Sequence, residues 1–228
     1  MSFIESKWTE SFAKSSELHT SHINPAMMQV LRIIGFNQKY AKAKGCSLWD
    51  DKGREYLDFL GGYSVFNLGH NPDAVLDVLK DVLGNSWPNL VQMDAPPLSG
   101  ALAKELTKRD PTGRLEYAYF GNSGAEAVEC ALKFARAATG RPRLLSFEGG
   151  FHGLSMGALS LCGDESWKEG FGPFLPGCKV VPYDDLVALE IELKQKDVAA
   201  ILIEPIQGEG GVRELSQDTW SEIQRMCR

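Results

Sequence analysis

A glycine turn between an apolar segment and a helical pattern, "YFGNSGAEAVECALKFARAATG" at residues 119–140, has the composition of an anion-binding site. Gly124 and Ala125 would leave their backbone N–H groups uncovered at the positive end of a helix dipole, directly after a strand, where a phosphate can bind. Ser123 and Glu126 also form a capping box, in which each side chain bonds a backbone amide at the helix start. The turn is therefore either an anion site or only a well-capped helix start, and its residues alone leave both readings open.

The residues around the turn narrow the kind of anion. No Lys-Ser or Lys-Thr pair follows Gly124, as a P-loop requires, and the turn contains no G-x-G-x-x-G pattern for a dinucleotide. A single phosphate group therefore fits this turn better than a triphosphate.

A second glycine-rich segment, "SFEGGFHG" at residues 146–153, follows the next predicted strand. It would lie at the carboxyl edge of the sheet, where open α/β sheets bind their ligands. Its glycines would let a loop bring Phe151 and His152 close to that edge. The alternative is a tight turn with a phenylalanine in the core.

The third segment is "ILIEPIQGEGG" at residues 201–211, an apolar strand that ends in Glu204 and is followed by a second carboxylate, Glu209. This arrangement predicts two acids at the same sheet edge, a setting in which carboxylates often have perturbed pKa values and functional roles. Exposed loop carboxylates are usually only solvated. Three such segments at one edge nevertheless favour a shared ligand site.

The elements that position these segments alternate after Pro111. Predicted strands "EYAYF", "RLLSF", "CKVVPY" and "AAILIEP" are separated by the helix that begins at residue 124 and by another at 186–194, which is typical of a parallel βαβ sheet. The first helix would end at Gly140 and Pro142. One face of it would carry Val128, Ala131, Leu132 and Ala135.

Before Pro111 the pattern differs. We expect a polar leader, a hairpin in "GCSLWDDKGREYLDFL" with its turn at residues 50–53, and helices at 74–83 and 98–108.

Composition makes several classes of function poor candidates. The formal net charge of −6, with no run of lysine or arginine, makes nucleic acid and anionic membranes poor partners. The longest apolar runs are too short to cross a bilayer, and the start lacks a secretory signal, so we expect a cytoplasmic protein. Five cysteines without a C-x-x-C pair argue against a zinc site or a disulfide framework, and His19 and His22 fit a solvated leader better than metal ligands.

The motifs "GNSGAEA", "FHG" and "EPIQGEGG", in this order, resemble the class III aminotransferases, pyridoxal-phosphate enzymes of fold type I such as the ornithine, acetylornithine, 4-aminobutyrate and putrescine aminotransferases. The upstream stretch "GCSLWDDKGREYLDFLGGYSVFNLGHNP" resembles the opening segment of that family. The resemblance implies an incomplete α/β fold of type I. Residues 1–72 would belong to the small domain, and residues 73–228 would form the first half of the large, parallel-sheet domain that binds the cofactor.

The resemblance also implies where pyridoxal 5'-phosphate would bind. Gly124 and Ala125 would give their amides to its phosphate, with Ser123 beside them. Phe151 would stack on the pyridine ring, since an aromatic face attracts a cationic heterocycle, and His152 would lie next to it.

On the substrate side, Glu204 would lie near the ring substituents, while Glu209 and Tyr63 would face the substrate. The implied reaction transfers an amino group from an amino donor to a 2-oxo acid, with the cofactor as electron sink. Ornithine-type members have an arginine three residues after the stacking aromatic, where this chain has Leu154. That difference leaves a diamine or ω-amino donor open beside an amino acid.

By the same resemblance, the sequence stops before the family's aspartate for the pyridine nitrogen and before its Schiff-base lysine. Lys133, Lys168 and Lys179 lack the context of that lysine. We therefore assign no catalytic residue and expect residues 1–228 to be inactive alone, with "EYAYF" deprived of a neighbouring strand.

Relatives in the family are homodimers, so a dimer is also implied. Two alternatives remain: a natural half-protein that binds the cofactor phosphate or pairs with a full-length subunit, and a Rossmann-like nucleotide-binding module.

Overall fold

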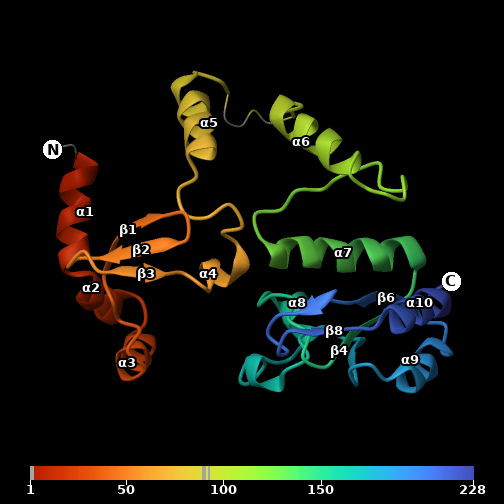
Figure 1. Ribbon diagram of the computed structural model, residues 1–228. Helices are drawn as coiled ribbons and strands as arrows, with labels where there is room; N and C mark the ends of the chain where they lie inside the picture. Colours follow the sequence, from red (N-terminus) through yellow and green to blue (C-terminus); the bar gives the residue numbers. More distant parts are fainter. Residues whose placement is uncertain (1–2, 89–90, 92) are drawn as a thin grey trace. The chain divides into compact units, whose positions relative to one another are not determined.

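The computed structural model describes residues 3–88, 91 and 93–228. Its chain forms two compact units, residues 1–94 and residues 95–228. Figure 1 labels the helices and strands of both. Among the described residues of both units, no helix is both long and apolar enough to span a membrane.

The first unit has three helices followed by a small sheet and two further helices. The helices of the leader are α1 (Phe3–Ala13), α2 (Ser15–His22) and α3 (Pro25–Ile33), and the later ones are α4 (Gly61–Ser64) and α5 (Asp73–Gly84). The antiparallel sheet has the order β1 (Tyr40–Lys44), β2 (Ser47–Asp50), β3 (Glu55–Leu57). The predicted hairpin and the helix at 74–83 are confirmed, whereas the leader helices and β1 were not predicted.

The second unit contains the parallel sheet. Its helices are α6 (Pro97–Thr107), α7 (Gly124–Thr139), α8 (Met156–Ser160), α9 (Leu186–Leu193) and α10 (Gln217–Met226), with a 3-10 turn at Glu165–Trp167. Its strands are β4 (Arg143–Phe147), β5 (Cys178–Val181), β6 (Val198–Leu202), β7 (Ile206–Gln207) and β8 (Arg213–Glu214). The strand order β5-β4-β6 is parallel throughout, so the predicted α/β class is confirmed.

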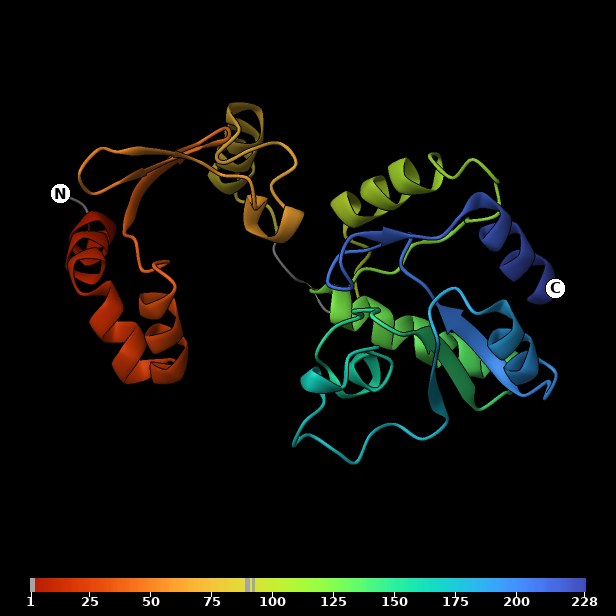
Figure 2. The same ribbon diagram turned by 60° about the horizontal axis from the view of Figure 1, so that its bottom comes forward.

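Alternate side chains of β4 face two different apolar clusters. Leu144 packs with Leu132 of α7, while Leu145 packs with Leu189 of α9 and Ile223 of α10. Helices therefore cover both faces of the sheet, as Figures 1 and 2 show for α7 and α9. This cover holds the carboxyl ends of β4 and β6 in fixed register, which is where the second and third motifs begin.

Two local expectations for this unit are wrong. Residues 116–120, predicted as a strand, belong to no sheet in the described chain, and Tyr117 and Tyr119 are 89% and 67% exposed. A strand needs a neighbour for its amides and carbonyls, and none of β4, β5 and β6 pairs with this segment. On α7, Leu132 is buried and Val128 and Ala135 are half-buried, as predicted, but Ala131 of the same predicted face is exposed.

The ends of α7 are set by its sequence. Ser123 Oγ accepts a hydrogen bond from Glu126 N at 3.2 Å, as a capping serine does. The Glu126 carboxylate reaches back to the amide of Asn122 and not to that of Ser123, so the cap extends one residue further than the predicted box. Gly140 ends the helix with a φ of 66°, a left-handed conformation that favours glycine.

Candidate functional site

The start of α7 presents two free backbone amides. Gly124 N and Ala125 N have no hydrogen-bond acceptor among the described residues, as is usual for the first turn of a helix, and the side chain of Ser123 accepts from Glu126 N instead. A Cβ placed on Gly124 would meet nothing within 4 Å. The helix dipole, the free amides and the open space together fit a bound phosphate.

The loop after β4 lies directly against this helix start. A Cβ on Gly153 would come within 2.7 Å of Ala125 Cβ and 3.0 Å of Ala125 Cα. Gly153 also has a φ of 123°, which side chains rarely adopt. The glycine is needed for both reasons, and it brings the first and second motifs together.

Phe151 and Glu204 are joined through the backbone. Phe151 N donates a hydrogen bond of 2.8 Å to Glu204 Oε2, and the half-buried Phe151 ring lies edge-on to the Trp167 ring with centroids 5.5 Å apart. Glu204, predicted to lie near the cofactor ring, thus holds the backbone of the residue predicted to stack on it. This contact brings the second and third motifs together.

His152 is buried, with 8% of its surface exposed, and burial lowers its pKa to about 4. The imidazole is therefore neutral near pH 7. Its Nε2 atom is buried without a hydrogen-bond partner among the described residues.

Gln207 and Arg213 complete the packing of the third motif. Gln207 Nε2 donates to Glu148 O at 2.9 Å, and Arg213 Nη2 donates to Gln207 Oε1 at 2.8 Å. A Cβ on Gly149 would come within 3.4 Å of Gly210 Cα. Three segments that are far apart in sequence therefore meet at the carboxyl edge of β4 and β6.

A pocket of about 480 Å³ opens beside these contacts. Its lining includes Phe151, Trp167, Glu209 and Arg213. Glu209 itself is exposed. Leu154, which follows Phe151 closely in the sequence, is 56% exposed. The pocket thus brings aromatic groups and a basic group together with Glu209, the acid that was predicted to face the substrate.

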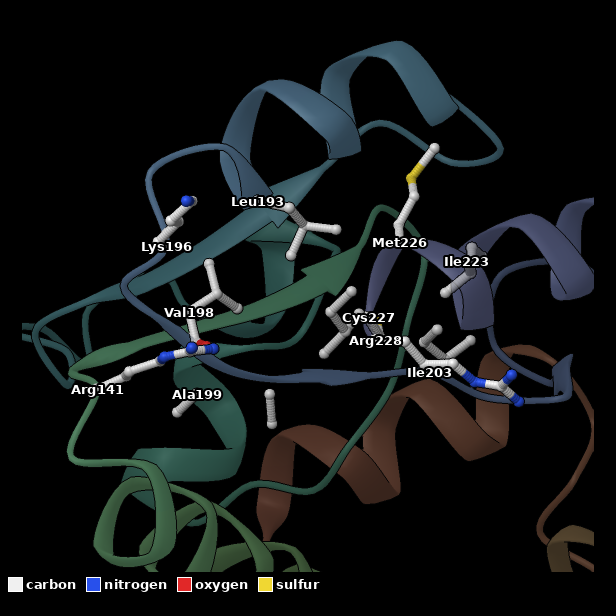
Figure 3. A pocket seen from close by; sticks show the side chains of 12 residues that line it. Arg141, Leu193, Lys196, Val198, Ala199, Ile203, Ile223, Met226, Cys227 and Arg228 are labelled. Carbon is white, nitrogen blue, oxygen red and sulfur yellow. The ribbon is translucent and has the colours of Figure 1, made fainter.

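A second pocket, of about 510 Å³, lies elsewhere in this unit, along β6 and α10. Figure 3 shows its apolar lining, which includes Ile203, Ile223 and Met226, with Arg141 and Lys196 at the opposite end. It contains none of the predicted site residues, so its size alone does not make it the candidate site.

Tyr63 lies in the first unit, on a strained turn. Gly61, Gly62, Tyr63 and Ser64 all have φ values between 58° and 64°. A left-handed conformation costs about 1–2 kcal/mol for each residue other than glycine, so this turn needs outside support. The side chain of Tyr63 is 83% exposed.

Asp58 supplies that support. Its Oδ1 accepts hydrogen bonds from Leu60 N at 3.0 Å and Gly61 N at 2.9 Å, while its Oδ2 pairs with His70 Nε2 at 2.8 Å. The Gly61 amide, and after it the His70 side chain, lower the pKa of Asp58. The carboxylate is therefore charged near pH 7 and fixes the turn that presents Tyr63.

Residues 35–228 match the family described as "Aminotransferase class-III". The chain belongs to the class III aminotransferases. This family uses pyridoxal 5'-phosphate, as the predicted resemblance implied.

Three curated relatives of this class III chain have different names. "Aminotransferase PigE" of a Serratia species is 35% identical over an alignment of 230 positions that covers 100% of this chain and 27% of that protein. The acetylornithine aminotransferase of Bacillus cereus is 39% identical over 83% of this chain and 48% of its own length. The putrescine aminotransferase of Pectobacterium atrosepticum is 37% identical over 90% and 46%, respectively. The chain thus spans about half, or less, of the length of these relatives.

Solved structures agree with this class III assignment. An ornithine aminotransferase from Toxoplasma gondii superposes with a TM-score of 0.74 at 30% identity and covers 83% of this chain, which spans 46% of that one. The taurine:2-oxoglutarate aminotransferase of Bifidobacterium kashiwanohense, in complex with PLP and glutamate, gives a TM-score of 0.81 at 25% identity, with coverages of 94% and 52%. The fold is therefore that of a partial type I aminotransferase.

Sequence reasoning did not single out Trp167, Gln207 or Arg213, each of which contacts one of the three motifs, or Glu129, which bonds the segment directly after the second motif. Gln207 stands inside the quoted third motif, so its position between two glycine-flanked segments was a usable signal. Trp167, Arg213 and Glu129 have no such local pattern, because their partners are distant in sequence.

Proposed function

We propose that this chain supplies the phosphate-binding and ring-binding side of a site for pyridoxal 5'-phosphate-dependent amino transfer. The observation that carries the proposal is the meeting of the free amides of α7 with the loop bearing Phe151. Gly153 packs on Ala125, and Glu204 bonds the amide of Phe151. Family membership supports the cofactor, and these contacts support its location.

In this proposal the chain's own residues bind and orient the cofactor. Gly124 N and Ala125 N donate to the phosphate, with Ser123 at the rim of the same turn. Phe151 gives its ring face to the pyridine ring, an interaction that aromatic packing favours. His152, neutral because its pKa is about 4, adds no charge beside that ring. When bound, the cofactor supplies the electron sink for exchange of the amino group.

The pocket beside Phe151 suggests the class of amino donor. Leu154 stands where ornithine-type members carry a carboxylate-binding arginine, and Glu209 gives the pocket an acidic group. Because Arg213 of the same lining is cationic, these features leave a diamine or an ω-amino compound open as donor beside an α-amino acid, with a 2-oxo acid as acceptor. Tyr63 and Glu209 are the proposed substrate-facing residues.

We further propose that residues 1–228 do not turn over alone. Lys168 Nζ is paired with Glu165 at 2.8 Å and Lys179 Nζ with Glu192 at 2.6 Å, while Lys133 is exposed on α7. These contacts support none of the three as the lysine that would bond the cofactor. A homodimer stays a prediction, which light scattering of the purified chain would test.

Pyridoxamine 5'-phosphate is the best probe of the proposed site, because it cannot form a bond with a lysine. We expect it to bind the chain, and we expect Gly124→Asp to weaken that binding about tenfold or more by placing a carboxylate against the phosphate. Gly124→Asn is the matched control, since it has the same size without the charge and the site has room for both. An aspartate in the first turn favours the helix, so unfolding would not explain the loss.

Two results would contradict the proposal. One is equal affinity of the Asp and Asn variants for pyridoxamine 5'-phosphate. The other is tight binding of a nucleotide with no binding of the cofactor, which would favour the nucleotide-binding alternative. Amino transfer to 2-oxoglutarate or pyruvate by residues 1–228, with one lysine labelled stoichiometrically by pyridoxal phosphate and borohydride, would contradict the predicted inactivity.

A further inference from the structure

Glu129 lies one helical turn after Ala125, on the same face of α7. Its Oε1 accepts three hydrogen bonds from the segment that follows the Phe151 loop: from Ser155 Oγ at 2.7 Å, from Gly157 N at 2.7 Å and from Ala158 N at 3.1 Å. Two of these donors are backbone amides at the start of α8, which a carboxylate satisfies well.

The contacts of Glu129 continue a line of attachment along α7. Ala125 touches Gly153, and one turn later Glu129 bonds Ser155 and Gly157. Glu129 and Gly157 are closely packed, because a Cβ on Gly157 would overlap the Glu129 carboxylate. The loop is thus fastened to α7 at two successive points directly after Phe151 and His152.

Burial tends to raise the pKa of Glu129, but the hydrogen bonds from Ser155, Ala158 and Gly157 outweigh it and lower the pKa overall. The carboxylate is therefore charged near pH 7. Glu204 holds the other side of the same loop through the amide of Phe151. Two carboxylates from different elements thus fix one short loop.

We propose that Glu129 is a positioning residue for the cofactor: it sets the distance between the amides of α7 that bind the phosphate and the loop that carries Phe151 and His152. The inference rests on the proposed function, because it takes Phe151 to be the stacking ring. Without Glu129, residues 155–158 lose three hydrogen bonds to α7, and the loop loses its attachment one helical turn beyond the Gly153 contact. The phosphate and the ring would then no longer meet their partners at the same time.

The test compares Glu129→Ala, Glu129→Gln and Glu190→Ala in the 228-residue chain. Glu190 is an exposed acid on α9 and serves as the matched control. The dissociation constant for pyridoxamine 5'-phosphate is measured by calorimetry. Amide exchange at Gly157 and Ala158 and the NMR signals of Phe151 report the loop without any ligand.

We expect Glu129→Ala to speed exchange at both amides, to shift the Phe151 signals and to raise the dissociation constant about tenfold or more, because charged acceptors make strong hydrogen bonds. Glu129→Gln keeps an acceptor oxygen and should remain within about threefold of the native chain. Glu190→Ala should change none of the three measurements.

Fast exchange in Glu129→Ala with a dissociation constant within about twofold of native would show that Glu129 only caps α8, and would overturn the proposal. If the native chain does not bind pyridoxamine 5'-phosphate, the proposed function fails, and unchanged Phe151 signals in Glu129→Ala would then overturn the positioning role separately. Should that variant unfold, Ser155→Ala removes a single donor. Its expected effect is a rise of about threefold in the dissociation constant, and no rise would overturn the proposal.

Discussion

Gly153→Ala should separate the loop of Phe151 from the start of α7. The added Cβ would lie 2.7 Å from Ala125 Cβ and 3.0 Å from Ala125 Cα, and the latter is backbone that cannot rotate away. Overpacking of this kind costs about 1–3 kcal/mol. The φ of 123° adds about 1–2 kcal/mol for a residue other than glycine, so the free energy of unfolding of the second unit should fall by about 2–5 kcal/mol.

Gly140, directly after the end of α7, and Gly124, at its start, separate these contributions. Gly140 has a positive φ of 66° but open space around it, so Gly140→Ala should cost only about 1 kcal/mol. Gly124 has neither a positive φ nor a neighbour within 4 Å, and Gly124→Ala should stay within about 0.5 kcal/mol of the native chain.

Urea unfolding followed by tryptophan fluorescence is the assay, since Trp167 and Trp220 both lie in the second unit. With a slope of about 1.5 kcal/mol per molar urea, Gly153→Ala should lower the midpoint by about 1.3–3.3 M. Equal midpoints for Gly153→Ala and Gly140→Ala would refute the close approach of the loop to α7.

Three further predictions concern other parts of the site. Burial gives His152 a pKa of about 4 in the folded chain, against 6.5 when unfolded. Its contribution to stability is therefore full above pH 6.5 and falls as the pH drops toward 4, by about 1–3 kcal/mol after solvent screening. His152→Gln should reduce this pH dependence in urea titrations, and an unchanged dependence would assign it to another group. Phe151→Ala should weaken pyridoxamine 5'-phosphate binding by about 1–3 kcal/mol, measured by calorimetry, whereas a purely structural phenylalanine would lower the melting temperature equally with and without ligand. Asp58→Ala should speed amide exchange at Gly61 and Val65 while the β1–β2 ladder stays protected, because Asp58 supports the left-handed turn, and Asp58→Asn should largely retain protection; uniform exchange in all three chains would argue against this role.

Elements with a strong local signal were predictable. β4 and β6 are short apolar runs that follow turn residues, and α7 has its serine cap and its terminal glycine in the sequence. The leader helices α1 and α2 were missed because the leader was taken as polar throughout, although Ile4, Trp8 and Phe12 of α1 recur at a helical spacing of four. β1, "YAKAK", was missed because its alternating lysines and alanines give little sign of a strand.

The candidate site was likewise predictable only in part. The meeting of three motifs at one sheet edge was predictable, because parallel strands bring their carboxyl ends together. The contacts that hold the motifs were not. The hydrogen bond from Phe151 N to Glu204 and the packing of Gly153 on Ala125 depend on how distant segments approach, which neither spacing nor composition specifies.

The strand order β5-β4-β6 bears on how the chain folds during synthesis. All three strands lie within residues 143–202, and β4 pairs first with β5 and then with β6 as each leaves the ribosome. Such short separations favour fast folding, and chains fold from the N-terminal side as they emerge. The last strand to arrive leaves its outer edge unpaired among the described strands, beside the apolar pocket of Ile203 and Ile223. That rim, like the outer edge of β5, is therefore open to a chaperone or to aggregation in a nascent chain.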